Sequence, residues 1–217
     1  MANARRELGL EYIAITDHSA SHGFGNHVAP DELKRQIEEI RKLDERLEGI
    51  RVLVGTETNI GTTGQPDYDD DVLEQLDWVI GSVHTSFAIG SQAMTDRMVA
   101  AIEHPLIDAI GHPTGRKISR RAPYAVDIDA VIDAAARTGT MLEINSAPDR
   151  RDLNDVNARN AVQAGVRVIV NSDAHGAETL IHTRWGIATA RRAWLTKADI
   201  ANTLPWEQFA ALRKRAR

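Results

Sequence analysis

The sequence predicts an α/β fold in which short buried strands alternate with longer helices. Six apolar runs, each too short for an ordinary helix, recur along the 217-residue chain. A stretch with helical spacing of its apolar residues follows most of these runs. Because parallel strands need crossover helices between them, the alternation favours either a (β/α) barrel or a doubly wound sheet.

The expected elements follow from the position of each apolar run. Strands are expected at residues 12–15, 52–54, 78–83, 107–110, 141–144 and 166–170. Helices are expected at residues 30–47, 70–76, 93–102, 129–138, 158–163 and 189–194. In the first helix Leu33, Ile37 and Ile40 share one stripe, which is typical of a helix that covers a sheet. Gly139 and Gly165 follow two of the helices as stop signals.

Composition narrows the class of protein. With 42% hydrophobic residues and no linker, residues 1–217 are expected to form a single domain. The absence of cysteine excludes disulfides and thiolate metal sites. A formal charge of -5 argues against a dedicated nucleic-acid surface. No apolar run approaches the roughly 20 residues that span a bilayer, and no signal peptide opens the chain, so a cytoplasmic protein without a membrane partner is expected.

Polar side chains stand where five of the six predicted strands end. In a barrel the carboxyl ends of the strands share one rim, so these side chains are expected to converge. Imidazole and carboxylate ligands without thiolates suit Zn, Mn or Fe. A single histidine at such a place is usually structural, but the joint pattern predicts a metal site. The candidate ligands are His18, Glu57, His84, His112, Asp173 and His175, and Asn145 ends the remaining strand.

Several neighbouring residues keep two interpretations. Asp17 either orients an imidazole of the site or caps a helix. His22 and His27 either overhang the site or are exposed loop histidines. Arg116 and Arg150 follow two of the strand ends and either contact a phosphate or are solvated loop charges.

The acidic run at residues 67–71 lacks the spacing of a calcium loop, and it is expected to mark a helix N-terminus.

Four segments, AITDHS, GHPTGR, LEINSAPDRRDLND and NSDAH, resemble the PHP (polymerase and histidinol phosphatase) family. The similarity runs almost end to end and is greatest to the PHP domain of bacterial family X DNA polymerases. The resemblance implies a distorted (β/α)7 barrel with up to three divalent metal ions. It also implies hydrolysis of phosphate esters, either by a small-molecule phosphatase or by a 3′-5′ exonuclease that acts on a nucleic-acid 3′ end.

The resemblance also implies roles for individual residues. Glu57 corresponds to the carboxylate that bridges two metals, with His84 and His112 as further ligands of one of them. Asp173 corresponds to a ligand of the other metal. His18 and His175 correspond to ligands of the third metal.

The implied mechanism is attack on phosphorus by a water that the metals activate. Proton transfer is assigned to His18, Asp173 or His175. Binding of the phosphate is assigned to Arg116, Arg150 and Asn145.

The chain departs from the family pattern at its front and at Asn59. In the family, the opening strand carries a His-x-His pair, and the given sequence has no such pair ahead of its first predicted strand. In addition, Asn59 stands where family X polymerases often have an acid. We therefore expect a barrel without its first strand, with one well-held metal at Glu57, His84 and His112. We also expect two unpaired sheet edges that favour association. The alternative function is a catalytically impaired, metal-binding remnant.

Overall fold

The computed structural model describes residues 9–21 and 28–216, and within them one sheet of six parallel strands. The strands are β1 (Tyr12–His18), β2 (Arg51–Asn59), β3 (Trp78–Ser82), β4 (Ala109–Ile110), β5 (Met141–Asn145) and β6 (Val168–Asn171). Their order in the sheet is their order in the chain. A doubly wound sheet reverses its strand order at a switch point, so the sequential order matches the barrel type of the two expected folds.

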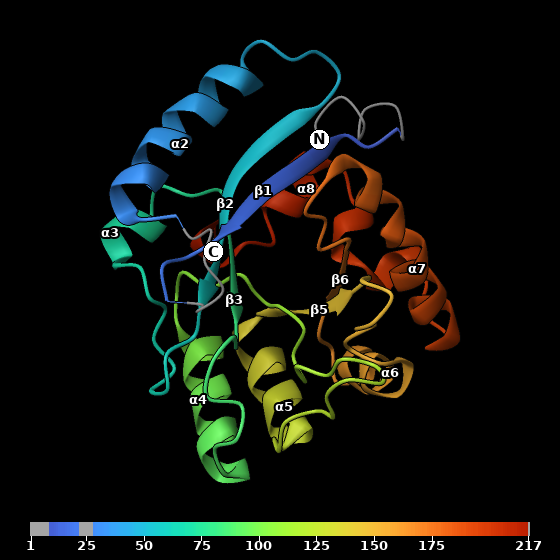
Figure 1. Ribbon diagram of the computed structural model, residues 1–217. Helices are drawn as coiled ribbons and strands as arrows, with labels where there is room; N and C mark the ends of the chain where they lie inside the picture. The colour runs from blue at the N-terminus through green and yellow to red at the C-terminus, as the bar shows by residue number, and fades with distance from the viewer. Residues whose placement is uncertain (1–8, 22–27, 217) are drawn as a thin grey trace.

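Helices cover the outer face of the curled sheet (Figure 1). They are α2 (Pro30–Asp44), α3 (Asp70–Leu73), α4 (Ser91–Glu103), α5 (Ile128–Thr138), α6 (Asp155–Gln163) and α7 (Thr183–Arg192). Helix α8 (Trp206–Ala210) lies at one end of the barrel, and four short 3-10 helices lie at Ala177–His182, Lys197–Asp199, Ala201–Thr203 and Lys214–Ala216. Helix α5 begins where Asp127 accepts hydrogen bonds from two main-chain N–H groups, and it ends at Gly139 with a φ of 72°. The stop signal at Gly139 is thereby confirmed.

Helix α7 differs most from expectation, since it begins at Thr183 and not at residue 189. Gly186, a residue type that disfavours helix, lies in the part of α7 that precedes the predicted start. A Cβ atom at Gly186 would lie 2.1 Å from Oγ of Ser146 and 2.6 Å from Cγ1 of Val170. The glycine is therefore required by the close packing of α7 on the sheet, which a sequence pattern does not display.

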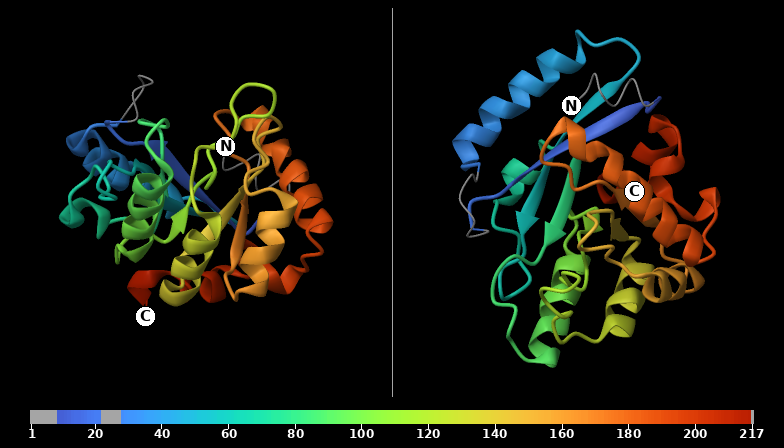
Figure 2. Two further views of the ribbon diagram at one scale, coloured as in Figure 1. Left: turned by 90° about the horizontal axis from the view of Figure 1, so that it is seen from below. Right: turned by 45° about the vertical axis from the view of Figure 1, so that its right-hand side comes forward.

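The C-terminal segment closes the end of the barrel at which the strands begin (Figure 2). The opposite end, at which the strands finish, is called the loop end. Phe209 packs between Tyr12 at the start of β1 and Trp78 at the start of β3, with ring centroids 5.2 Å and 4.9 Å away. Tyr12 Oη donates to the carbonyl of Leu204 at 3.0 Å. The main-chain N–H of Lys214 donates to the buried Asp108 carboxylate just before β4. These contacts leave the loop end of the strands available for a site.

The two outer strands of the sheet, β1 and β6, differ in whether their outer edges are covered. Asn202 lies beside β6, accepts a hydrogen bond from the main-chain N–H of Val170 at 3.0 Å and donates to its carbonyl at 2.8 Å. Val168 also forms a parallel bridge with Ile200. The prediction of two unpaired edges is thus wrong for β6, because one amide side chain and one short segment replace the neighbouring strand. Within the described residues, β1 has β2 as its one neighbouring strand.

A cavity of about 610 Å³ opens between β1 and β6. Its lining runs from His18 and Asp173 at the loop end to Tyr12 and Phe209 at the closed end. Consistently, β1 is only partly buried, whereas β3 and β5 are buried along their whole length. The barrel is therefore open on one side in the part of the chain that the structure describes.

Candidate metal centre

Three imidazoles meet the carboxylate of Glu57 at the loop end of the barrel. His112 Nε2 lies 3.0 Å and His84 Nε2 lies 3.2 Å from Oε1 of Glu57, while His18 Nε2 lies 3.5 Å from Oε2. His18 ends β1, Glu57 projects from β2, and His84 and His112 lie two residues after the ends of β3 and β4. The convergence expected from four separate strand ends is present in the structure.

The spacing of the ligand atoms of His18, Glu57 and His84 fits a divalent cation. Ligands about 2.0 to 2.1 Å from a tetrahedral ion lie about 3.3 Å from one another. The three nitrogen to oxygen distances at Glu57 fall close to that value. Ligand atoms of His18, Glu57 and His84 all lie within 4.8 Å of one another. The two carboxylate oxygens of Glu57 face different histidines.

The protonation states also suit metal binding. Burial alone would raise the pKa of Glu57, but hydrogen bonds from His112 and His84 outweigh it and hold that pKa well below its usual range. Burial, followed by the positive charge of Arg150, lowers the pKa of His112. A carboxylate that stays ionised beside an imidazole that stays neutral is the form that coordinates a cation.

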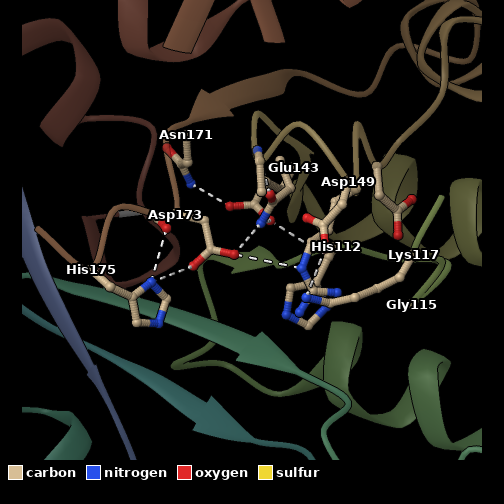
Figure 3. Close-up of polar contacts among 12 residues, drawn as sticks. His112, Gly115, Lys117, Glu143, Asp149, Asn171, Asp173 and His175 are labelled. Atoms are coloured by element: carbon tan, nitrogen blue, oxygen red, sulfur yellow. Dashed lines mark hydrogen bonds and ion pairs between the residues drawn. The ribbon is translucent and has the colours of Figure 1, made fainter. Parts of the chain in front are cut away.

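Asp173 and His175 lie across the opening from this cluster, after β6. Asp173 Oδ2 accepts a hydrogen bond from Asn145 Nδ2 at 3.0 Å and lies 3.6 Å from Nε of Arg150. Its Oδ1 lies 3.8 Å from Nδ1 of His175, whose side chain is 71% exposed (Figure 3). The rings of His175 and His18 have centroids 5.7 Å apart. His18 and His175, which the resemblance assigns to one metal, therefore lie close together.

The two arginines expected at the phosphate are placed differently. The Arg150 side chain is 12% exposed and its buried Nη1 has no hydrogen-bond partner within the described residues. Arg116 instead donates from Nε to the carbonyl of Arg150 at 2.9 Å and from Nη2 to the carbonyl of Arg151. Arg116 thus shapes the loop that carries Arg150.

Glu143 on β5 was missed by the sequence analysis. It is buried, and its carboxylate accepts hydrogen bonds from the main-chain N–H of His112 at 2.7 Å and from Nδ2 of Asn171 at 2.9 Å (Figure 3). Burial, with the neighbouring charges of Asp173 and Glu57, raises the pKa of Glu143 to about 8. An acid two residues before Asn145 points to the same face of a strand, and that spacing was the available signal.

Asn59 contacts one candidate ligand, His84, and Asp17 is the chain neighbour of another, His18. Asn59 is buried and its Oδ1 accepts a hydrogen bond from the main-chain N–H of His84 at 3.1 Å. Asp17 is exposed and accepts a hydrogen bond from Nε2 of Gln36 in α2 at 2.5 Å, a contact that matches neither interpretation of this residue. His22 and His27 lie outside the described residues.

Comparison with known proteins shows which family the chain belongs to. No protein-family model matches it. It is 39% identical over 215 residues to DNA polymerase/3'-5' exonuclease PolX of Bacillus subtilis, covering 99% of this chain but 38% of that protein. It is 35% identical over 185 residues to a probable phosphatase of Caldanaerobacter subterraneus, covering 80% of this chain and 68% of that protein. The chain belongs to the PHP family.

The fold of a solved structure agrees with this membership. The histidinol phosphate phosphatase of Lactococcus lactis, solved with zinc, L-histidinol and phosphate, superposes with a TM-score of 0.60 at 17% identity. The match covers 89% of this chain and 86% of that one. At this identity the likeness establishes the PHP fold alone. No helix in the described residues is long and apolar enough to cross a membrane.

Proposed function

We propose that this chain is a metal-dependent phosphoesterase whose principal cation is held by Glu57, His84 and His112. The observation that carries the proposal is the buried Glu57 carboxylate, which has nitrogens of His84 and His112 3.2 Å and 3.0 Å from one oxygen and a nitrogen of His18 3.5 Å from the other. Relatives named as probable phosphatases support the reaction class. A bound divalent cation would neutralise phosphate oxygens and lower the pKa of a water toward neutrality.

The chain's own residues account for orientation and charge. Glu57 supplies one oxygen toward His84 and His112 and the other toward His18, and we infer that it bridges two cations. Asp173 lies beside Arg150 and adds a second carboxylate at the opening. His175 is exposed at the rim, and His18 lies near it, so either imidazole can exchange a proton with solvent.

Arg150 is the proposed phosphate-binding residue. Its guanidinium is largely enclosed beside Asp173, and one buried nitrogen has no partner among the described residues. A guanidinium binds phosphate oxygens with charge-assisted hydrogen bonds. Asn145 joins it at the same rim, whereas Arg116 is expected to contribute mainly by holding the loop of Arg150.

We infer two candidate substrate classes, a small phosphomonoester and the 3′ end of a nucleic acid. The exonuclease in the name of the Bacillus relative favours the second, but this chain spans 38% of that protein. Hydrolysis rates on a generic phosphomonoester and on a short single-stranded oligonucleotide separate the two classes. Ordinary phosphatase activity without shortening of the oligonucleotide would assign the first.

A second candidate function is a metal-binding remnant with little turnover. Within the described residues, the cavity between β1 and β6 leaves one side of the proposed site open to solvent, which favours weak metal retention and little turnover. The test is bound metal and hydrolysis measured on the same sample. Bound metal without hydrolysis above the chelator-treated background would support the remnant and contradict the enzyme.

A further inference from the structure

Glu143 connects three strand ends beneath the proposed ligands without belonging to their cluster. Its Oε2 accepts hydrogen bonds from the main-chain N–H of His112 at 2.7 Å and from Nδ2 of Asn145 at 3.2 Å. Its Oε1 accepts from Nδ2 of Asn171 at 2.9 Å. Figure 3 shows this carboxylate between Asn171 and His112. One buried side chain therefore contacts the ends of β4, β5 and β6.

His112 needs such an anchor because its backbone is unusual. Its φ is 30°, which residues other than glycine rarely adopt. A backbone held in such a conformation persists only where surrounding contacts determine it. The short hydrogen bond from its N–H to Glu143 is such a contact, and the direction of the imidazole follows from the main chain that it fixes. The position of His112 Nε2 relative to Glu57 thus depends on Glu143.

The same carboxylate is linked to the ligand on the other side of the opening. Asn145 Nδ2 donates both to Glu143 at 3.2 Å and to Asp173 Oδ2 at 3.0 Å. A displacement of Glu143 therefore changes the support of Asp173 as well as that of His112. Two proposed ligands on different strands share one buried support.

We propose that Glu143 is a positioning residue that holds His112 and Asp173 in place around Glu57, acting through the location of its oxygen atoms. The proposal rests on the proposed function only for the identity of the metal ligands. Residues that hydrogen-bond to ligands typically change metal affinity by about 10- to 100-fold when they are lost. Side-chain length and the carboxyl group are separable at this residue, because glutamine keeps the length and one acceptor oxygen, whereas aspartate keeps the carboxyl group on a shorter side chain.

The test compares Glu143→Gln with Glu143→Asp. Zinc affinity is measured by competition with a chromophoric chelator, and ligand geometry by the visible absorption of the Co²⁺ form. We expect Glu143→Gln to retain the wild-type cobalt spectrum and nearly the wild-type zinc affinity. We expect Glu143→Asp to lose at least about tenfold in zinc affinity and to change the spectrum. Wild-type behaviour of Glu143→Asp, or equal losses in both variants, would overturn the proposal.

Asp108→Asn is the matched control. Asp108 is also buried and also accepts hydrogen bonds from main-chain N–H groups, of Val79 and Lys214, but at the closed end of the barrel. Its replacement is expected to affect stability and leave the cobalt spectrum unchanged.

If Glu143→Asp does not fold, as judged by circular dichroism, Asn145→Ala takes its place. That variant keeps the bond between Glu143 and His112 and is expected to weaken only the Asp173 side, seen as a lower zinc stoichiometry with an unchanged cobalt spectrum. An unchanged stoichiometry would overturn the proposal.

The outcome for the wild type separates this inference from the proposed function. Absence of zinc binding by the wild-type protein would contradict both. Zinc binding without phosphoester hydrolysis would contradict the proposed function and leave the comparison of Glu143 variants valid, since neither readout depends on turnover.

Discussion

His112 Nε2 lies 3.0 Å from Oε1 of Glu57, in a place where both side chains are almost fully buried. The two residues come from β2 and from the segment after β4, which are separated in the sheet by β3. In the curled sheet the two side chains meet across β3. The contact therefore links the shape of the barrel to the chemistry of its rim, and several measurable consequences follow from the residues around it.

Replacement of Arg150 by glutamine is expected to weaken phosphate binding. Charge-assisted hydrogen bonds contribute about 1.5 to 3 kcal/mol, so KM for a phosphomonoester should rise about tenfold or more. The positive charge of Arg150 also lowers the pKa of His112, so that pKa should rise in the metal-free variant. Steady-state kinetics and histidine NMR titration measure the two effects. Arg120→Gln, on an exposed loop residue, is the control, and an unchanged KM in Arg150→Gln would contradict the assignment.

The metal-free protein should lose stability with rising pH through Glu143. The pKa of this acid is raised to about 8 in the folded chain, above its value in the unfolded chain. Between the unfolded and the folded pKa, the folded state binds a proton that the unfolded state has released. The free energy of unfolding therefore falls as the pH rises through this range. Urea unfolding at about pH 5 and about pH 9 should show a fall that is smaller in Glu143→Gln. Equal falls in both proteins would show that Glu143 does not titrate in this way.

Asn202→Ala should destabilise the fold by exposing β6. The substitution leaves the N–H and the carbonyl of Val170 without their amide partner. Loss of such partners costs about 1 to 3 kcal/mol, which chemical denaturation resolves. Asn160→Ala, on the exposed face of α6, is expected to change stability by less than about 0.5 kcal/mol. Association of Asn202→Ala at high concentration, measured by light scattering, would further identify β6 as the protected edge.

Gly186→Ala should destabilise the packing of α7. The added Cβ would lie 2.1 Å from Oγ of Ser146, and overpacking of this kind typically costs about 1 to 3 kcal/mol. Gly90 at the start of α4 has no heavy atom within 4 Å of an added Cβ, so Gly90→Ala serves as the control. A melting temperature equal to that of the wild type in Gly186→Ala would show that the helix can move outward.

The fold class was predictable because each strand carries its own signal. Short apolar runs ended by polar residues located all six strands, and the ends of those runs located Glu57, His84 and His112. The sequential order follows from crossover helices of ordinary length. By contrast, the first half of α7 was missed because its glycine serves a tertiary contact with Ser146.

The supporting residues of the candidate site were less predictable than its proposed ligands. Glu143 lies inside an apolar run and looks like an isolated acid, and its hydrogen bonds are made to segments distant in sequence. Arg116 and Arg150 have the same loop context in the sequence, yet one holds main-chain carbonyls and the other lies beside Asp173. Asn202 replaces a strand with one side chain, which no periodic pattern shows. Long-range partners of single polar side chains have no local signature.

The most direct test of the central claim is the metal content of wild-type protein and of His84→Ala, measured with phosphomonoester hydrolysis on the same samples. His84 Nε2 lies 3.2 Å from Glu57 Oε1, so its removal takes one ligand from the proposed site. We predict bound divalent metal and hydrolysis in the wild type, with both lost in His84→Ala and after chelation. A wild-type protein that binds no metal, or a His84→Ala variant that keeps both metal and hydrolysis, would contradict the account.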